Sequence, residues 1–408
     1  MPMIETRPFR KSPTFVAVDF FCGAGGTTRG LIDAGGYVIA GIDKDSRCKP
    51  TYIANNRNLT RDLAAPRFLH RDIFPIDPLY PNGQQQELFD DLDHLIAAAR
   101  EAAPKTPLLF AICAPCQPFT KLSRTQLSAS RTKTRDRDSH LLSEALKFVE
   151  HYSPELVLSE NVQGINDPKY GGVWEEFRQT LETLGYATGS EIVCASAFGI
   201  PQYRKRSILI ALRGSIARQD RLADGSPRRL TVPKGDPKTS VRTVRSAISH
   251  LPALEAGAAD PHFPNHRARS LSQLNQKRMA AARPGASNAC LDDTPDGDLS
   301  LACHRSVNAK LKTRCFNDVY TRMHPDRPSP TITTKCHSIS NGRFGHYDVR
   351  QLRGISLREA AILQSFPQDY IFHPVGMIEP IARMIGNAVP PKLAEYFSRY
   401  LVESIAYD

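Results

Sequence analysis

The sequence predicts an α/β protein, with a doubly wound sheet and a second, smaller, loop-rich domain. Three observations predict this fold class. Short apolar runs alternate with helical stretches through the first half of the 408-residue chain. A turn of small residues, from Cys22 to Gly26, follows the first apolar run. After Leu212, Pro, Gly, Ser and Arg replace the regular alternation. Strands that alternate with helices are typical of a sheet covered by helices on both faces.

The expected strands are apolar runs too short to form a helix. Runs of this length, bounded by turn residues, are typical of buried strands. They lie at residues 14–20, 37–42, 108–112, 156–158 and 207–212, with a further strand expected just before Asp72. Open α/β folds bind their ligands at the edge of the sheet where the parallel strands end.

Helical periodicity fills the intervals between these runs. The expected helices cover residues 45–56, 84–103, 139–151 and 173–184, and helical patterning returns at 356–366 and 391–405. Residues 213–326 show little periodicity and indicate a separate loop-rich region.

Composition favours a polyanionic partner and disfavours a membrane protein. The 53 Lys and Arg exceed the 42 Asp and Glu by 11. No apolar run approaches the ~18 residues of a spanning helix, and the first residues lack the apolar segment of a secretory signal. The nine cysteines are scattered and odd in number, which favours a reducing cytoplasm over a disulfide framework.

Two blocks concentrate the positive charge. Residues 121–137 carry six Lys or Arg against one Asp, and residues 202–245 carry twelve against three. A basic run is often only a solvated loop, but two such blocks together favour a track for phosphates.

A nucleoside site is expected at the ends of the first three strands. The segment DFFCGAGG, residues 19–26, follows the first strand and opens a helix, and its small residues let the backbone approach a ligand. It is not the G-x-G-x-x-G fingerprint of dinucleotide sites, because position 28 is Thr28. Asp43 ends the second strand, where a carboxylate can bind ribose hydroxyls. Asp72 follows the third strand, where its carboxylate can accept a hydrogen bond from an adenine amino group.

A candidate nucleophile lies at the end of the fourth strand. The segment APCQPFT, residues 114–120, follows the apolar run 108–112, so a proline-flanked turn delivers Cys116 to the edge of the sheet. Glu160 follows the neighbouring strand and can face this thiol. Gln202, Arg204 and Arg206 alternate in an extended segment and would share one face.

Seven segments occur in the order and composition of one known family. They are FCGAGG (21–26), PCQ (115–117), ENV (160–162), QYRKR (202–206), RPSPTITT (327–334), REAA (358–361) and GNAVPP (386–391). The chain resembles the cytosine-C5 DNA methyltransferases of bacterial restriction-modification systems, which use S-adenosylmethionine. One departure is Ile112-Cys113-Ala114, where many members carry glycine and proline before the Pro-Cys pair.

The resemblance implies a Rossmann-like methyltransferase sheet and three parts of the chain. Residues 1–212 would form the catalytic and cofactor-binding domain, residues 213–375 the target-recognition domain, and residues 376–408 a segment that returns to the catalytic domain. It also implies an enzyme of the DNA (cytosine-5)-methyltransferase class that flips its target base out of the helix.

The resemblance assigns roles to individual residues. The implied catalytic residues are Cys116, Glu160, Arg204 and Arg206. The implied cofactor-binding residues are Phe21, Gly23, Gly25, Gly26, Asp43, Asp72, Ile73, Pro115, Asn387 and Val389. The implied DNA-binding residues are Gln117, Thr120, Lys121, Arg124, Gln202 and Thr331.

The implied partners and setting follow from these roles. Double-stranded DNA would be the substrate, with a cognate restriction endonuclease as a further partner. We expect no metal, no membrane contact, a monomer, and a cytoplasmic, nucleoid-associated protein.

Other functions compete with this interpretation. Methylation of cytosine C5 in tRNA would use the same fold. Cys113 and Cys116 have the C-x-x-C spacing of a thiol oxidoreductase, and a DNA-binding module without catalysis is a third alternative. Cys303-His304, Cys315 and Cys336-His337 could assemble a zinc site, but their spacings fit no C-x2-C pairing.

Overall fold

The structure is a computed structural model that describes residues 12–59, 63–115, 140–167, 172–214, 230–236, 241–312 and 315–405. Its chain contacts divide it into two compact units. The first, called here the sheet unit, comprises Glu5–Cys194, Lys205–Asp236 and Ala388–Asp408. The second, called the loop unit, includes Ala195–Arg204 and Pro237–Asn387. The functional boundaries predicted at residues 212 and 375 remain a prediction.

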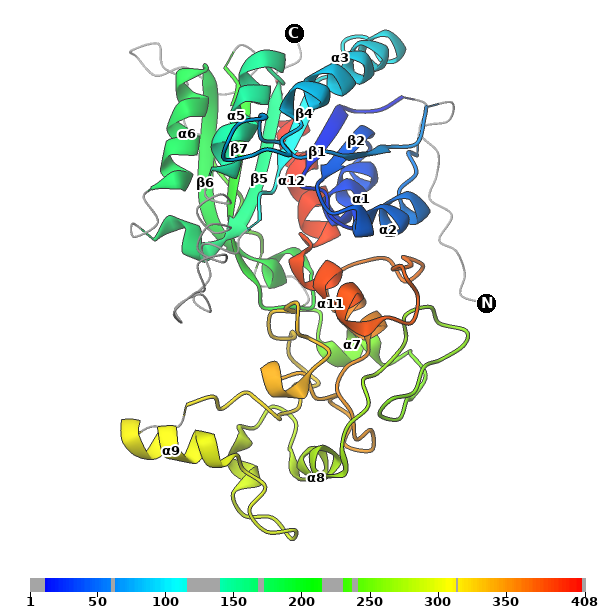
Figure 1. The fold of residues 1–408 in the computed structure, drawn as a ribbon, viewed down its shortest axis with the longest axis vertical. Helices are drawn as coiled ribbons and strands as arrows, with labels where there is room; N and C mark the ends of the chain where they lie inside the picture. The colour runs from blue at the N-terminus through cyan, green and yellow to red at the C-terminus, as the bar shows by residue number, and fades with distance from the viewer. Residues whose placement is uncertain are drawn as a thin grey trace. The chain divides into compact units, whose positions relative to one another are not determined.

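The sheet unit is built on one seven-stranded sheet (Figure 1). Its order is β3-β2-β1-β4-β5-β7-β6, and neighbouring strands are parallel except at β7, which is antiparallel to β5 and β6. The strands are β1 (Val16–Phe20), β2 (Tyr37–Asp43), β3 (Arg67–His70), β4 (Leu108–Ile112), β5 (Leu156–Val162), β6 (Tyr186–Cys194) and β7 (Lys205–Arg213). The predicted α/β class with a doubly wound sheet is confirmed.

Helices cover both faces of this sheet because its strands are apolar on both sides. Phe20 and Phe110 stack edge to face, with ring centroids 5.1 Å apart, in a core that also buries apolar side chains of α3, α5 and α6. The next residue back along β1, Asp19, faces the opposite side and meets Thr28 of α1. These helices are α3 (Gln85–Ala102), α5 (Leu141–Tyr152), α6 (Val173–Thr183) and α1 (Gly26–Asp33).

The C-terminal helix also belongs to the sheet unit. Helix α12 (Pro391–Glu403) packs beside α1 (Figure 1), and Gly30 permits the contact: a Cβ there would lie 2.3 Å from the Pro391 carbonyl oxygen. Residues predicted as one helix over 45–56 form a short 3-10 turn, Ser46–Cys48, followed by α2 (Lys49–Asn55).

The loop unit has little regular structure among its described residues. Its helices are α7 (Val244–Ile248), α8 (Gln273–Ala281), α9 (Ala302–Leu311), α10 (Leu357–Leu363) and α11 (Ile378–Asn387). Side chains of buried arginines, rather than paired strands, donate hydrogen bonds to several of its backbone carbonyls. The Arg322 guanidinium donates to the carbonyls of six residues: Met279, Ala282, His346, Asp348, Val349 and Gln351.

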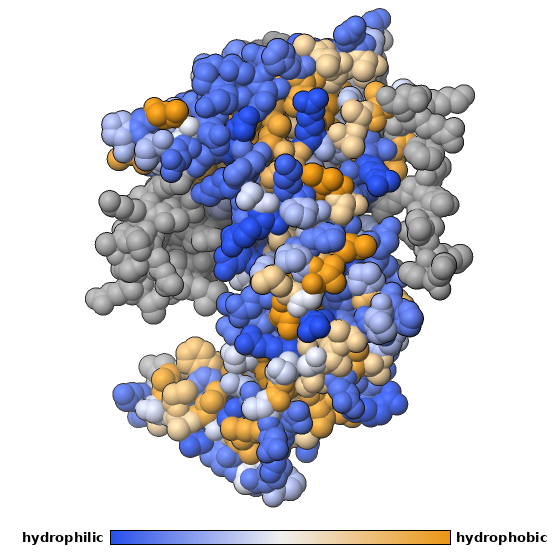
Figure 2. Space-filling model, turned by 45° about the vertical axis from the view of Figure 1, so that its right-hand side comes forward, coloured by the Kyte–Doolittle hydropathy of each residue, from blue (hydrophilic) through white to orange (hydrophobic). Residues whose placement is uncertain are grey.

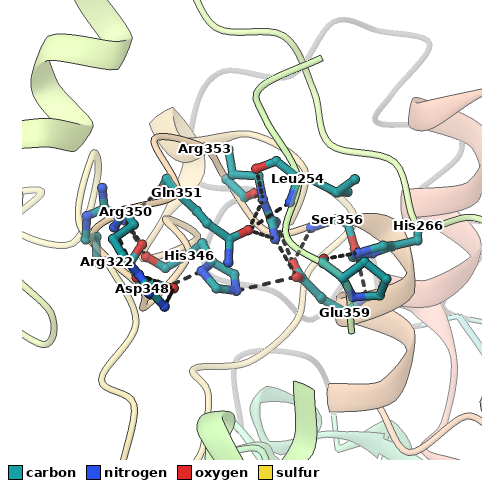
Figure 3. A network of polar contacts seen from close by, with 12 residues as sticks. Leu254, His266, Arg322, His346, Asp348, Arg350, Gln351, Arg353, Ser356 and Glu359 are labelled. Carbon is teal, nitrogen blue, oxygen red and sulfur yellow. Dashed lines mark hydrogen bonds and ion pairs between the residues drawn. The ribbon is translucent and has the colours of Figure 1, made fainter. Parts of the chain in front are cut away.

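A second buried arginine anchors α10 (Figure 3). Arg353 donates two hydrogen bonds, of 2.8 and 2.7 Å, to the two carboxylate oxygens of Glu359. Glu359 also accepts from the Ser356 amide, while the Ser356 hydroxyl accepts from the Glu359 amide. This reciprocal capping box fixes the start of α10.

The surface drawn in Figure 2 is largely hydrophilic, with hydrophobic residues in small patches. Among the described helices, none is both long and apolar enough to cross a membrane.

Candidate active site

A pocket lies at the carboxyl ends of β1 and β2 and along the chain that follows β3 and β4. Five of the predicted cofactor-binding residues line it: Phe21, Asp43, Asp72, Ile73 and Pro115. Phe20, Ile42, Lys44, Arg71 and Leu141 complete the lining. The pocket therefore combines apolar side chains with two carboxylates, at the edge where the topology predicts a ligand.

The turn after β1 brings its backbone against Asp43. Gly23 and Gly25 have φ angles of 51° and 91°, in the region that glycine adopts without strain. The Gly23 amide donates to Asp43 Oδ2 at 2.8 Å, and the Asp45 amide donates to Asp43 Oδ1 at 2.8 Å. Burial raises the pKa of Asp43 above its ordinary value, although these two amides oppose the shift. Gly26 begins α1 directly after the turn.

Asn387 and Val389, two further predicted cofactor-binding residues, fall in different units. Asn387 ends α11 in the loop unit and is exposed, whereas Val389 is buried in the sheet unit. Their predicted cofactor contacts remain a prediction.

Two side chains of β5 hold the chain that leads from β4 to Pro115. Strand pairing between β4 and β5 stops at Ala111 and Leu158. Beyond it, the Ser159 hydroxyl donates to the Ile112 carbonyl, and Asn161 Nδ2 donates to the Ala114 carbonyl at 3.2 Å. These carbonyls lie beyond the pairing of β4 with β5, so the side chains supply hydrogen bonds that this pair of strands no longer gives. Residues 159 and 161 were not predicted to act in this way.

Glu160 and Arg206 form an ion pair at the same edge of the sheet unit. Arg206 Nε lies 2.8 Å from Glu160 Oε1, and the two side chains are 10% and 11% exposed. The register pairs Glu160 with Ile208 and Val162 with Arg206. Positions 160 and 206 are therefore diagonal neighbours on one face of the sheet, within reach of long side chains. A carboxyl group and a guanidinium together offer hydrogen bonds to the edge of a polar ring.

Three further predicted residues lie in the loop unit and bond within it. Gln202 and Arg204 are 0% and 3% exposed. The side-chain amide of Gln202 donates to the Leu363 carbonyl, and the Arg204 guanidinium donates to the Ile332 carbonyl. The Thr331 hydroxyl donates to the Tyr203 carbonyl at 2.8 Å. Gln202 also donates to Gln364, and its predicted DNA contact remains a prediction.

Five predicted residues lie outside the described residues: Cys116, Gln117, Thr120, Lys121 and Arg124. Their roles remain predictions. The chain is described up to Pro115, the residue before the candidate nucleophile.

The other cysteine of the C-x-x-C spacing is Cys113, which is partly buried. Burial, followed by the charge of Glu160, raises the pKa of the Cys113 thiol well above its ordinary value. Reactive thiols of this motif have lowered pKa values instead. Within the described part of the chain, no three His, Cys, Asp or Glu residues cluster as metal ligands.

Comparison with known proteins identifies the family. Residues 86–403 match the C-5 cytosine-specific DNA methylase family. The type II methylase M.HgiDII of Herpetosiphon aurantiacus is 34% identical over 94% of this chain and 93% of its own length. The type II methyltransferase M1.HphI of Haemophilus parahaemolyticus is 27% identical over 93% of this chain and 84% of its own length.

Solved structures show the same fold. A DNA modification methyltransferase encoded within an E. coli prophage superposes with a TM-score of 0.61 and 19% identity, covering 96% of this chain and 99% of its own. The Dnmt2 methyltransferase of S. pombe gives a TM-score of 0.54 and 18% identity, covering 95% and 98%. With 34% identity over most of the chain and a family match over residues 86–403, the protein belongs to the C-5 cytosine-specific DNA methylase family, and the predicted enzyme class is confirmed.

Proposed function

We propose that this enzyme transfers a methyl group from S-adenosylmethionine to C5 of a flipped-out cytosine in a specific double-stranded DNA sequence, through a covalent bond between Cys116 and C6. The observation that carries the proposal is the Glu160–Arg206 pair. Glu160 lies on β5, next to the strand β4 that leads to Pro115 and Cys116, and Arg206 lies on β7. Relatives named type II methylases support DNA as the substrate and a restriction-modification setting, with a cognate endonuclease as partner.

The pocket residues fit the chemistry of S-adenosylmethionine. The carboxylates of Asp43 and Asp72 are acceptors for ribose hydroxyls and for an adenine amino group. Phe21, Ile73 and Pro115 offer apolar faces to the flat adenine ring. Gly23, Gly25 and Gly26 would keep the turn free of side chains next to the ligand, and Asn387 and Val389 would complete the site. When bound, S-adenosylmethionine supplies the electrophilic methyl group.

The protein's own residues would activate the cytosine. The Cys116 thiolate forms a bond to C6, and electron density moves to C5, which otherwise is a poor nucleophile. Glu160, in its protonated form, donates to ring N3 and accepts from the exocyclic amine, while Arg206 donates to O2. After methylation a base removes the C5 proton, and the Cys116–C6 bond breaks to return the thiolate.

DNA contacts would come from residues after the nucleophile and from the loop unit. The target must leave the helix, because C6 is unreachable inside it. Gln117 and Thr120 would fill the gap, Lys121 and Arg124 would hold phosphates, and Thr331 would contact the backbone. Because its DNA substrate lies in the nucleoid, we place this enzyme there, in the cytoplasm. We infer that it acts as a monomer.

Bisulfite sequencing of DNA from cells that express this chain tests the proposal. Wild-type protein should leave unconverted cytosines within one repeated sequence, and the Cys116→Ser variant should leave none. Equal protection by the two proteins would remove Cys116 from the mechanism, and protection by neither would contradict the proposed function.

A further inference from the structure

One buried guanidinium joins two distant segments of the loop unit. Arg204 Nη1 donates to the Ile332 carbonyl at 3.0 Å, and Arg204 Nη2 donates to the Gly386 carbonyl at 3.2 Å. The Arg204 residue is 3% exposed. A guanidinium holds its N–H donors in a rigid planar fork, so it can fix two carbonyls in one relation, whereas the three donors of an ammonium group rotate on a flexible stem.

The two segments that Arg204 holds also touch each other directly. A Cβ on Gly386 would lie 2.3 Å from both the Thr333 carbonyl carbon and the Thr334 amide nitrogen. The end of α11 therefore packs backbone to backbone against residues 333–334, and any side chain at position 386 would separate them. Arg204 bonds to a carbonyl on each side of this contact.

Gln202 reinforces the same junction from two residues away. Its side-chain oxygen accepts from the Ile332 amide at 2.9 Å. Its side-chain nitrogen donates to Gln364, whose own amide donates to the Ile385 carbonyl at 3.2 Å. Ile332 is thus held at its N–H by Gln202 and at its carbonyl by Arg204. The end of α11 is held at residue 385 through Gln364 and at residue 386 by Arg204.

We propose that Arg204 is a positioning residue, which sets the place of the α11 end and of residues 331–334, and that it does not contact the target base. This inference rests on the proposed function, because Asn387 follows Gly386 and Thr331 precedes Ile332. Arg206 differs, since its guanidinium faces Glu160 in the sheet unit. Two arginines of one segment therefore have separate tasks: Arg204 affects the binding of both ligands, and Arg206 affects the chemical step.

The matched variants Arg204→Lys and Arg206→Lys test this division. Binding of S-adenosylmethionine is measured calorimetrically without DNA, and kcat and KM for DNA are measured at saturating S-adenosylmethionine. Arg204→Lys should weaken S-adenosylmethionine binding and raise KM for DNA, each at least tenfold, with kcat within threefold of wild type. Arg206→Lys should lower kcat at least a hundredfold and leave S-adenosylmethionine binding unchanged.

The opposite pattern would overturn the inference. If Arg204→Lys binds S-adenosylmethionine as wild type does but loses kcat, then Arg204 contacts the target. Wild-type protein that binds no S-adenosylmethionine would instead contradict the proposed function. Circular dichroism shows whether each variant folds. If Arg204→Lys does not fold, Gly386→Ala decides, because it keeps Arg204 but separates the two backbones: tenfold weaker binding is expected, and wild-type binding would refute the proposal.

Discussion

Two fully buried carboxylic acids, one in each unit, have pKa values that are shifted in opposite directions. In the sheet unit, Asp19 accepts a hydrogen bond from Thr28 at 2.6 Å, and burial raises its pKa to about 7 against the effect of that bond. In the loop unit, burial also opposes ionisation of Glu359, but the charge and hydrogen bonds of Arg353 outweigh it and lower its pKa to about 2. Burial alone favours the neutral acid, and a buried guanidinium reverses that preference.

The contrast follows from how each unit satisfies its backbone. The sheet unit pairs its carbonyls along seven strands and fills its core with apolar side chains. The loop unit, in its described residues, has short helices and isolated bridges, so many of its buried carbonyls need side-chain donors. Arg322 and Arg353 supply these donors. Buried charged groups thus stabilise the backbone of the loop unit. In the sheet unit, charged pairs such as Arg29 and Asp33 lie on its helices.

The largest effect is expected from Glu359→Gln. The change leaves the Arg353 guanidinium buried without a counter-charge, which should cost about 3–5 kcal/mol of unfolding free energy. Urea unfolding at pH 7 measures it. Glu379→Gln is the control, because that carboxylate is 62% exposed and should change stability little. A Glu359→Gln protein as stable as wild type would show that Arg353 needs no buried counter-charge.

The pH dependence of Glu359 has a definite sign. Its folded pKa is depressed, so its contribution is present above its ordinary pKa and is lost as pH falls toward 2.

The Asp19→Asn variant tests the other side of the comparison. Because the folded pKa of Asp19 is raised, its contribution is present below the ordinary pKa near 3.8 and is lost as pH rises to about 7. The loss should be on the order of 4 kcal/mol. Wild-type protein should therefore lose stability between pH 4 and pH 8 relative to Asp19→Asn, as measured by urea midpoints. Parallel profiles for the two proteins would mean that Asp19 is ionised when folded.

A smaller effect on stability is expected from Asn161→Ala. The Ala114 carbonyl loses its side-chain donor, at a cost of about 1–2 kcal/mol. The same change should lower kcat at least tenfold, because Asn161 holds the chain next to Pro115. Asn55→Ala, which removes a side-chain bond to the Thr51 carbonyl in α2, is a matched control that should leave kcat unchanged. Full activity of Asn161→Ala would show that this clamp has no part in the site.

The smallest effect is expected at the surface of the loop unit. Lys277 pairs with Asp296 at 2.6 Å, but the two side chains are 53% and 46% exposed. Solvent screens such a pair, so Lys277→Gln should change the unfolding free energy by less than about 0.5 kcal/mol. A larger loss would show that exposed charge also stabilises this unit.

Much of the fold could be predicted because its signals are local. Strand β4 has the predicted bounds, and α1 begins where the glycine turn ends. Strand β6 was missed, because Thr188, Gly189, Ser190 and Glu191 interrupt its apolar residues. The reversed direction of β7 follows from its pairing with β5 and β6, which no local pattern encodes.

Strand ends gave a local signal for the candidate site, and the structure places Asp43 at the pocket and Glu160 beside Arg206. Contacts that depend on long-range packing gave no such signal. The Ser159 bond to Ile112 exists only because pairing of β4 with β5 stops one residue earlier. The burial of Arg322 contradicts the general preference of arginine for the surface. Ser356 and Glu359, by contrast, have the S-x-x-E spacing of a capping box, a signal present in the sequence.

The proposed bond between Cys116 and cytosine C6 can be trapped with 5-fluorocytosine in the target duplex. Fluorine cannot leave C5 as a proton does, so the thiol should remain attached to the DNA after methyl transfer. We expect a denaturation-resistant protein–DNA complex that needs S-adenosylmethionine, maps to Cys116 by mass spectrometry, and is absent from Cys116→Ser. If the enzyme methylates ordinary target DNA but forms no such trapped complex, the proposed bond between Cys116 and C6 is wrong.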